Sequence, residues 1–592
     1  MKRFIVPSVR SNQSLKNYLS VWGLALFTLV AAFAVSPVEA GDKLTFDRLE
    51  LKTGLNSLKA DTVEIENANL SADALKSLFA DQNPASQADA LAKFDADRLT
   101  IRSLRQETSI NGQISASILR NVVLTGIKAG VAESLKSDGG TFGSGDANDA
   151  QAGTMGPITA SKIDLGILIA GGATKTGKKD DYRTAYGEVI LTTITTEAPA
   201  GPVITVDRIS ITEFRIKTSE QGLSALAERV IRRQSAALST DADINSMALD
   251  IVDLLSGFTI ATSDATQIRI EDKKSGEYAR INHIIYQGDV SGTGQHIRMD
   301  GFEGAFEGSR VRIGSVEQSG FSFNPVYSSI RATASKPNGK LSEADPLSFV
   351  PVIGKFEVHD VTIDTTDVPP VHAGLRSMIL SVDNPTGGIP KSINLAFDGL
   401  FGPIPSDSNE PSIDNLIALG YRDVSLSGTL KLAIDEKAKM FKTEALISGE
   451  NMGAIGVTTN LINVPVDLLM RNPSAALIAF AGARVKDLSV TVENRGLTER
   501  LIDQDAIKTK RSPQEVRKNY AAAASASLQV YLGMSPNAKA LTQALAKFID
   551  KPARLSITAR SKSPDGVALA EGATAENPAQ LLEAFDLMIS QN

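Results

Sequence analysis

One stretch, Val206-Asp207-Arg208-Ile209-Ser210-Ile211, shows the pattern on which the fold of this chain depends. An apolar or small residue is followed by two mostly polar residues, an apolar residue, one polar residue and another apolar residue. The last four positions alternate with a period of two, which places apolar side chains on one face of a β-strand and polar side chains on the other. The stretch therefore predicts a half-buried strand.

Ten further copies of this pattern are spread along the chain. They begin at Phe46, Ala60, Ala96, Ala160, Ala265, Gly308, Val358, Tyr421, Val485 and Pro552. Their spacing is too irregular for a solenoid of fixed period. We predict an α+β, β-dominated fold: elongated, mainly antiparallel repeated strands with short interspersed helices and a C-terminal helical cap.

Three copies of the pattern run on into a short amphipathic helix. Ser71 is the expected N-cap of the first helix, and Gly222 and Gly496 precede the second and third. Nearer the C-terminus, Ser512-Pro513-Gln514-Glu515 is a capping box with Pro at the first helical position. Ser535-Pro536 predicts a further helix, and Asn577-Pro578 predicts a last one that runs to Ile589.

A break in composition marks residues 137–157, which are rich in Gly, Asp and Ala and hold little that could be buried. We expect a flexible linker there. About 550 residues remain after a leader segment, which is too many for one compact core. The expected modules are an N-terminal β/α module (41–136), a central β-rich module (158–345), a second β-rich module (346–484) and a C-terminal strand plus helical module (485–592).

The first 40 residues have the features of a secretory signal peptide. Four basic residues precede an apolar run from Val21 to Val35, and Val38-Glu39-Ala40 is a small-x-small cleavage site. Fifteen apolar residues are fewer than the roughly 20 that span a bilayer. We expect cleavage after Ala40 and export to the periplasm or cell envelope, with a retained anchor as the alternative.

Charge and cysteine content limit the kinds of partner. Removal of residues 1–40 takes away four basic residues and Glu39, so the formal charge moves from -7 to -10. An acidic chain disfavours nucleic acid and anionic lipid surfaces as partners. An exported chain without Cys has no disulfides, and burial and strand pairing must supply its stability.

Two stretches partly match known ligand loops. Residues 172–178 have the Gly-x4-Gly-Lys spacing of a phosphate-binding loop, but Lys179 follows where Ser or Thr should hold magnesium, so a hairpin tip is favoured. Residues 240–245 place Asp241, Asp243 and Asn245 near the spacing of a calcium loop. A helix capped by Thr240 fits this second stretch better, with a buried stripe at Ile244, Met247, Ala248, Ile251, Leu254 and Leu255.

Two charged clusters are candidate sites. His359, Asp360, Asp364, Asp367 and His372 could supply metal ligands, but His359 and Asp360 fill the polar pair of a strand copy and are expected to be solvated. A basic cluster of Lys508, Lys510, Arg511, Arg517 and Lys518 is either the solvated start of a helix or a docking patch.

No motif indicates catalysis. The chain contains no Gly-x-Ser-x-Gly elbow and no thiol nucleophile. We therefore assign no catalytic, cofactor-binding or metal-binding residue. We expect an exported, non-catalytic scaffold or binding protein that holds an apolar ligand, such as a lipid, in a groove of the sheet. A secreted hydrolase with an acidic site and a surface or adhesion spacer remain as alternatives.

The short strands resemble those of the AsmA-like group of large β-rich envelope proteins. Asp97-Arg98-Leu99-Thr100-Ile101, followed by Ile110-Asn111-Gly112-Gln113-Ile114, is an example of this style. The resemblance implies curved sheets with an apolar groove that carries lipid between membranes. It rests on no specific residue motif, so no functional residue is transferred from it.

Overall fold

The computed structural model shows a β-dominated chain. It describes residues 43–591 apart from 54–55, 81–82, 111–112, 145–150, 175–180, 198–200, 235–239, 290–293, 337–338, 367–369, 384–389, 406–409, 436, 465–481 and 570–577. Strand outweighs helix, 53% against 28%, with 24 strands in one large antiparallel sheet and 11 α-helices among the described residues. The predicted fold class is confirmed.

Contacts within the chain divide it into two units. Unit 1 contains Met1–Gly304 and Tyr327–Ala344, and unit 2 contains Ala305–Val326 and Asp345–Asn592. Strand β13 (Gln295–Phe306) and helix α7 (Asn324–Ala334) cross the boundary. The module limits expected from the sequence stay a prediction.

The strands of unit 1 form antiparallel ladders. They are β1 (Lys43–Thr53), β2 (Asn56–Glu66), β3 (Ala96–Ile110), β4 (Gln113–Ile127), β5 (Val131–Ser137), β6 (Gly140–Ser144), β7 (Gln151–Met155), β8 (Ile158–Asp164), β9 (Tyr182–Glu197), β10 (Val203–Lys217), β11 (Phe258–Glu271) and β12 (Tyr278–Gln287). β1 to β4 pair in chain order, and so do β9 to β12.

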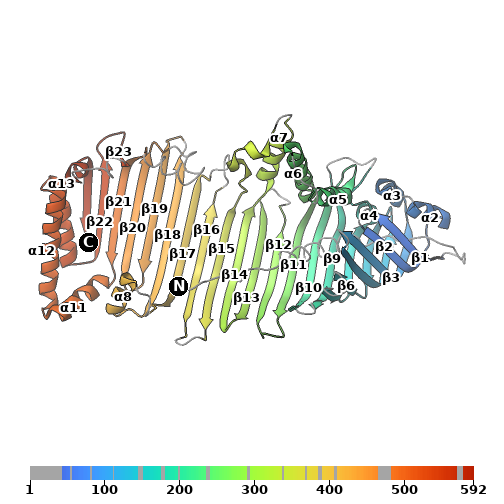
Figure 1. The fold of residues 1–592 in the computed structure, drawn as a ribbon, viewed down its shortest axis with the longest axis horizontal. Coiled ribbons are helices and arrows are strands. Elements are labelled where there is room, and N and C mark those ends of the chain that lie inside the picture. The colour runs from blue at the N-terminus through green and yellow to red at the C-terminus, as the bar shows by residue number, and fades with distance from the viewer. Residues whose placement is uncertain are drawn as a thin grey trace. The chain divides into compact units, whose positions relative to one another are not determined.

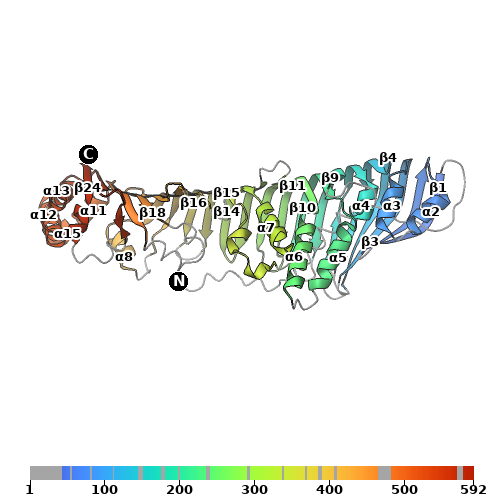
Figure 2. The same ribbon diagram turned by 90° about the horizontal axis from the view of Figure 1, so that it is seen from above.

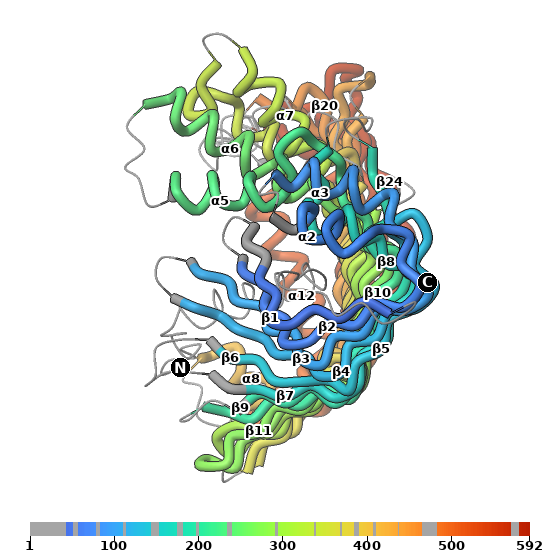
Figure 3. Tube along the Cα trace, turned by 90° about the vertical axis from the view of Figure 1, so that its right-hand side faces the viewer, coloured from blue at the N-terminus to red at the C-terminus, as the bar shows by residue number. Residues whose placement is uncertain are grey.

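Helices of unit 1 cover its first strands. They are α2 (Ala72–Ala80), α3 (Pro84–Leu91), α4 (Leu165–Ala170), α5 (Gly222–Gln234) and α6 (Asp241–Leu255), with the 3-10 turn η1 (Leu341–Glu343). Leu75 of α2 and Leu223 of α5 are buried in one core with Phe46, Leu99 and Phe214 of the strands. Figure 3 shows the strands of this unit curving beneath α2, α3 and α5.

In four copies of the repeated pattern, the polar pair contains a bend in the strand. The third residue of four copies has a left-handed φ of 50° to 54°: Arg48, Lys162, Gln267 and Asp360. In β1 the ladder skips Arg48, because Asp47 pairs with Thr62 and Leu49 with Ala60. Strict alternation would send Phe46 and Leu49 to opposite faces. The bend brings both into the same core.

The strands of unit 2 pair in chain order from β14 to β21. They are β14 (Ser309–Phe321), β15 (Gly354–Thr365), β16 (His372–Val382), β17 (Ser392–Pro403), β18 (Asp423–Asp435), β19 (Met440–Gly449), β20 (Gly453–Ile462), β21 (Arg484–Asn494), β22 (Arg554–Ser561), β23 (Val567–Ala568) and β24 (Phe585–Gln591). β21 continues to β22, and β22 to β24. The 3-10 turn η2 (Pro346–Phe349) precedes β15.

The helices of unit 2 gather near its C-terminal strands. They are α8 (Pro411–Ala418), α11 (Leu497–Thr509), α12 (Pro513–Leu532), α13 (Pro536–Asp550) and α15 (Pro578–Glu583). In Figures 1 and 2, α11 to α13 and α15 lie beside β22 and β24, whereas α8 lies at one set of strand ends. The predicted helical cap is confirmed.

The local signals of the sequence are largely confirmed. Strand is present in all eleven pattern copies. Ser71 Oγ accepts a hydrogen bond from the Ala74 backbone N–H at the start of α2. Ser512 and Glu515 form the predicted capping box, and Ser535 caps α13.

The linker prediction for residues 137–157 is wrong where the segment is described. β6 and β7 pair with each other, β6 also pairs with β4, and β7 with β9. Small residues are needed for close packing: a Cβ on Gly140 would lie 1.8 Å from the Ile118 carbonyl oxygen, and one on Gly153 would lie 2.3 Å from the Phe142 ring. The glycines therefore serve packing in the sheet rather than flexibility.

Two helix predictions also need correction. The helix after Asn577 ends at Glu583 and does not reach Ile589, because Phe585, Leu587 and Ile589 alternate with polar residues and form β24. In α6 the buried residues are Asn245 and Val252, whereas Ile244 and Leu255 of the predicted stripe are exposed. Asn245 explains the rotation, since its side chain donates to the Gly339 carbonyl oxygen in the segment before η1.

Candidate functional site

One face of strands β15 to β20 carries a continuous row of apolar side chains. Directly paired residues in adjacent strands point to the same face of a sheet. The register of these strands therefore aligns Phe356, Leu380, Leu395, Leu430, Ala445 and Val457.

Two flanking rows extend this apolar face. The next positions along the same strands align Val358, Met378, Phe397, Gly428, Ile447 and Ile455. On the other side of the first row lie Val382, Ile393 and Leu432. We call these three rows on β15 to β20 the apolar face.

The opposite face of the same strands is mostly polar. The row between the first and third apolar rows contains Lys355, Ser381, Asn394, Lys431, Glu444 and Thr458. Lys442 Nζ lies 2.5 Å from Glu444 Oε1, and Lys355 Nζ lies 2.6 Å from Glu357 Oε1. The Lys355 ammonium keeps the pKa of the Glu357 carboxyl below its usual range. This surface is suited to water, which makes the sheet amphipathic.

Most of the apolar face is only half buried on β15 to β19, although Val382 of β16 is buried. Ile447 is 49% exposed and Ile455 on β20 is 51% exposed. The hydrophobic clusters found among the described residues include no side chain of β14 to β18. A sheet with one apolar face normally covers that face with another layer. Here no described helix forms such a layer, and the face is partly exposed to solvent.

The same rows are covered farther along the sheet. The first row continues from Val457 to Val490, Ile557 and Ile589. There the α13 side chains Ala544 and Phe548 form a cluster with Leu555, and Val492, Leu545, Ile557 and Ile589 pack against it. The covered end shows that this is a core-type surface, so its exposure on β15 to β19 needs an explanation.

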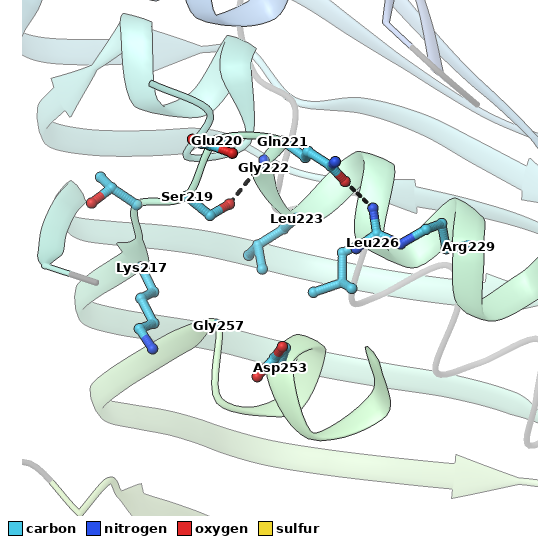
Figure 4. Close-up of a pocket in the computed structure, with 11 residues that line it drawn as sticks. Lys217, Ser219, Glu220, Gln221, Gly222, Leu223, Leu226, Arg229, Asp253 and Gly257 are labelled. Atoms are coloured by element: carbon cyan, nitrogen blue, oxygen red, sulfur yellow. Dashed lines mark hydrogen bonds between the residues drawn. The ribbon is translucent and has the colours of Figure 1, made fainter. Parts of the chain in front are cut away.

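A first cleft, of about 350 Å³, lies in unit 1 at the start of α5 (Figure 4). Leu223 and Leu226 point into it, and polar groups form its rim. Ser219 Oγ accepts from the Gly222 backbone N–H, and Asp253 Oδ1 accepts from Arg331 at 2.9 Å. Arg229 donates to Gln221. Its polar groups thus bond to one another and to α7, as expected of a structural junction.

A second cleft, of about 490 Å³, lies in unit 2 between the ends of β16 to β18 and α11. The Arg500 guanidinium lies 4.3 Å from the Tyr421 ring centroid and donates to the Leu419 carbonyl oxygen. Tyr421 Oη donates to the Asn451 carbonyl oxygen, and the His372 ring lies 5.2 Å from that of Phe401. These contacts fasten α11 to the sheet and do not align a nucleophile with a base.

The sequence candidates for metal binding are only partly brought together. His372 Nδ1 lies 2.6 Å from Asp364 Oδ1 across the β15–β16 pair, but His359 lies beside Glu357 farther along β15. Asp360 occupies the strand bend, and Asp367 is outside the described residues. In the part of the chain that the structure describes, no three His, Asp or Glu side chains converge on one point.

The two loop candidates take other structures. Thr240 and Asp243 form a reciprocal capping box at the start of α6, so Asp241, Asp243 and Asn245 lie on a helix and not around a cation. The hairpin expected around residues 172–178 is wrong on its first side, because the apolar residues before Gly172 form helix α4. Asp164 Oδ1 caps this helix by accepting a hydrogen bond from the Ile167 N–H. Residues 175–178 lie outside the described part of the chain.

The basic cluster lies where α11 ends and α12 begins. Lys508, Lys510, Arg511 and Lys518 are exposed, and Arg517 donates to the Asp550 backbone carbonyl oxygen at 3.0 Å. Among the helices that the structure describes, none is long and apolar enough to cross a membrane.

Comparison with protein families matches the C-terminal part of the chain. A family described as an uncharacterized protein matches residues 446–592. This region contains β20 to β24 and the helical cap, and leaves out β14 to β18. The curated proteins contain no match.

Proposed function

We propose that the chain is an exported, non-catalytic envelope protein that holds an apolar, acyl-type ligand on the apolar face of β15 to β20. The observation that carries this proposal is the change in cover along one set of rows. At β22 and β24 the rows pack against α13, where Leu555 is buried, and at Ile447 and Ile455 they are half exposed. Large exposed apolar patches on proteins mark interaction sites.

The dimensions of the apolar face suit an acyl chain. Six strands spaced about 4.8 Å apart give a width of roughly 24 Å. One leaflet of a bilayer core is about 15 Å deep, which sets the length of an extended acyl chain. A ligand covering roughly 200 Å² of apolar surface would gain about 5 kcal/mol before ordering costs. An acyl chain is therefore long enough to lie across several strands.

The arrangement of charge favours an apolar over a polar ligand. Charged side chains such as Lys355, Lys431 and Glu444 lie on the opposite face. The three rows of the apolar face contain no charged residue, so they offer no partner to a charged group. A polar headgroup would have to remain at the margin of the sheet, where it meets water.

Lipid extraction from purified protein tests this proposal. The full chain, prepared from its native host without detergent, should carry acyl lipid detectable by mass spectrometry. Ile447→Asp places a charge on the apolar face and should reduce bound lipid about tenfold. A lipid-free wild-type protein would favour the scaffold alternative.

Leu446→Asp is the matched control. Leu446 is the neighbour of Ile447 in β19, is similarly exposed at 46%, and lies on the opposite face. This variant should retain the ligand and match Ile447→Asp in stability. Equal loss of lipid from both variants would mean that the charge acts by disturbing β19, and the apolar face would then not be the site.

A further inference from the structure

Helix α12 exposes an unusual amount of apolar surface. Val516 is the buried residue of this helix. Val530 is 89% exposed, Tyr531 71% and the following Met534 62%. Tyr520 is also exposed. Side chains this large rarely gather on one solvent-facing helix of a soluble surface.

The exposed side chains continue a helix face that is covered at its start. Positions 516, 520, 523, 527 and 530 are three or four residues apart and share one face of the helix. At Val516 this face packs against Ile502 and Ala506 of α11. α11 ends at Thr509 with Lys510 as its left-handed C-cap, and its buried contacts with α12 are made at Val516. Beyond it, Tyr520 and Val530 are exposed.

Exposed cations flank this apolar surface. Between residues 506 and 540 the chain has six basic residues and one acidic residue, in a protein of formal charge -7. Lys508, Lys510, Arg511 and Lys518 are exposed and form no ion pair with the described residues. The one acid of this stretch, which follows Asp503 and Asp505, is Glu515. It is held by Ser512 in the capping box, and that backbone bond, together with the charges of Arg511 and Lys518, lowers the pKa of its carboxyl. Ile507, 79% exposed, lies directly beside Lys508.

The middle of α12 has the composition of an interfacial helix. Residues 519–534 contain no charged side chain, and two tyrosines lie among them. Tyr rings prefer the boundary between headgroups and acyl chains, and Lys and Arg side chains reach from there to phosphates. Twenty helical residues extend about 30 Å, so α12 can lie flat with both of its ends in the interface.

We propose that the α11–α12 end of unit 2 docks on an anionic membrane surface. Ile507, Tyr520, Val530, Tyr531 and Met534 enter the headgroup region. Lys508, Lys510, Arg511 and Lys518 meet the lipid phosphates. Charge complementarity selects this occupant, because a strongly basic segment in an acidic protein is attracted to anionic lipid while the rest of the chain is repelled. Docking at this end does not depend on a ligand on the apolar face of β15 to β20.

Vesicle co-sedimentation with the full chain tests the proposal. The protein should bind vesicles of phosphatidylcholine mixed with phosphatidylglycerol at least tenfold more tightly than vesicles of phosphatidylcholine alone, and high salt should weaken that binding. Lys508→Glu with Lys510→Glu should abolish the preference for anionic lipid. Val530→Asp with Tyr531→Asp should weaken binding about tenfold. All four side chains are exposed, so folding should be unaffected.

Matched controls separate docking from other effects. Lys437→Glu with Lys439→Glu reverses two exposed charges in the β18–β19 turn and should leave vesicle binding unchanged. Ile447→Asp should also leave it unchanged, which distinguishes docking from ligand binding on the sheet. Equal binding to both kinds of vesicle, or no effect of the Lys508 and Lys510 changes, would overturn the proposal. The proposal would also be overturned if the protein formed a dimer in solution, if Val530→Asp broke that dimer, and if the protein did not bind vesicles. A second copy of the chain would then be the occupant of this surface.

Discussion

Strand β1 of unit 1 and strand β15 of unit 2 carry copies of the same pattern and differ in what covers it. Phe46 and Leu49 of β1 are buried with helices α2 and α5 in a single core. In the corresponding copy on β15, Val358 and Val361 are only half buried. The repeated pattern therefore decides which side chains share a face, but not whether that face is buried.

Connections between strands account for the difference. In unit 1 the connection from β2 to β3 carries α2 and α3, and that from β10 to β11 carries α5 and α6. In unit 2, β15 to β16 and β18 to β19 are joined by a few residues each. A short connection has no room for a helix of two or three turns. The β17–β18 connection does carry a helix, α8, but this helix lies at one set of strand ends (Figure 1). The face is therefore uncovered because its connections are short or place their helix at the strand ends.

The largest expected effect compares a covered with an uncovered leucine. Leu99→Ala in unit 1 removes a fully buried side chain and should cost about 3 kcal/mol, through lost burial and a cavity. Leu430→Ala on the apolar face leaves no closed cavity and should cost about 1 kcal/mol. Hydrogen exchange followed separately in each unit measures both values, since two units need not unfold together. Equal costs would show that a ligand or partner buries the apolar face in solution.

The strand bends should behave alike in both units. Gln267 of β11 and Asp360 of β15 have left-handed backbones, which β-branched residues strongly disfavour. Gln267→Val and Asp360→Val should each cost about 2 kcal/mol in chemical unfolding, whereas Thr266→Val, one residue from the bend, should change stability by less than about 0.5 kcal/mol. If the stability losses of the two bend variants differ by more than about 0.5 kcal/mol, the backbone strain depends on the helices packed over the strand and not on the local conformation alone.

Much of the fold could be predicted from local signals, and the errors share a cause. Alternation placed the strands, and the Ser512 capping box placed α12, because both depend on neighbours in the chain. Residues 137–157 were misjudged because the need for Gly140 and Gly153 comes from Ile118 and Phe142 across the sheet. The stripe of α6 was misplaced because Asn245 bonds to Gly339, far along the chain.

The candidate site was predictable only in part. Leu395, Leu430 and Val457 could be recognised as strand residues with apolar side chains. Their alignment into rows depends on the register of five strand pairs, which no single strand encodes. The exposed surface of α12 also escaped prediction, because it appears only when the end of α11 is placed against Val516.

The smallest expected effects concern the first residue of the polar pair in each unit. Asp207 in β10 accepts two hydrogen bonds of 3.3 Å from Arg269, and about half of its side chain is exposed. An exposed ion pair contributes little. Asp207→Ser should therefore change the free energy of unfolding by about 0.5 kcal/mol or less.

Lys486 in β21 occupies the same place in its copy but is not merely solvated. Its Nζ donates to the Pro564 carbonyl oxygen at 3.0 Å, and so ties β21 to the turn after β22. A hydrogen bond from a charged donor is worth more than an exposed ion pair. Lys486→Ser should cost about 1 kcal/mol, and Lys486→Arg should recover most of it, because the guanidinium can still reach the turn. Hydrogen exchange at residues 554–568 gives the measurement. Equal losses of unfolding free energy for Asp207→Ser and Lys486→Ser would contradict this expectation. They would mean that the first residue of the polar pair contributes equally in both units, whatever it contacts outside its own strand.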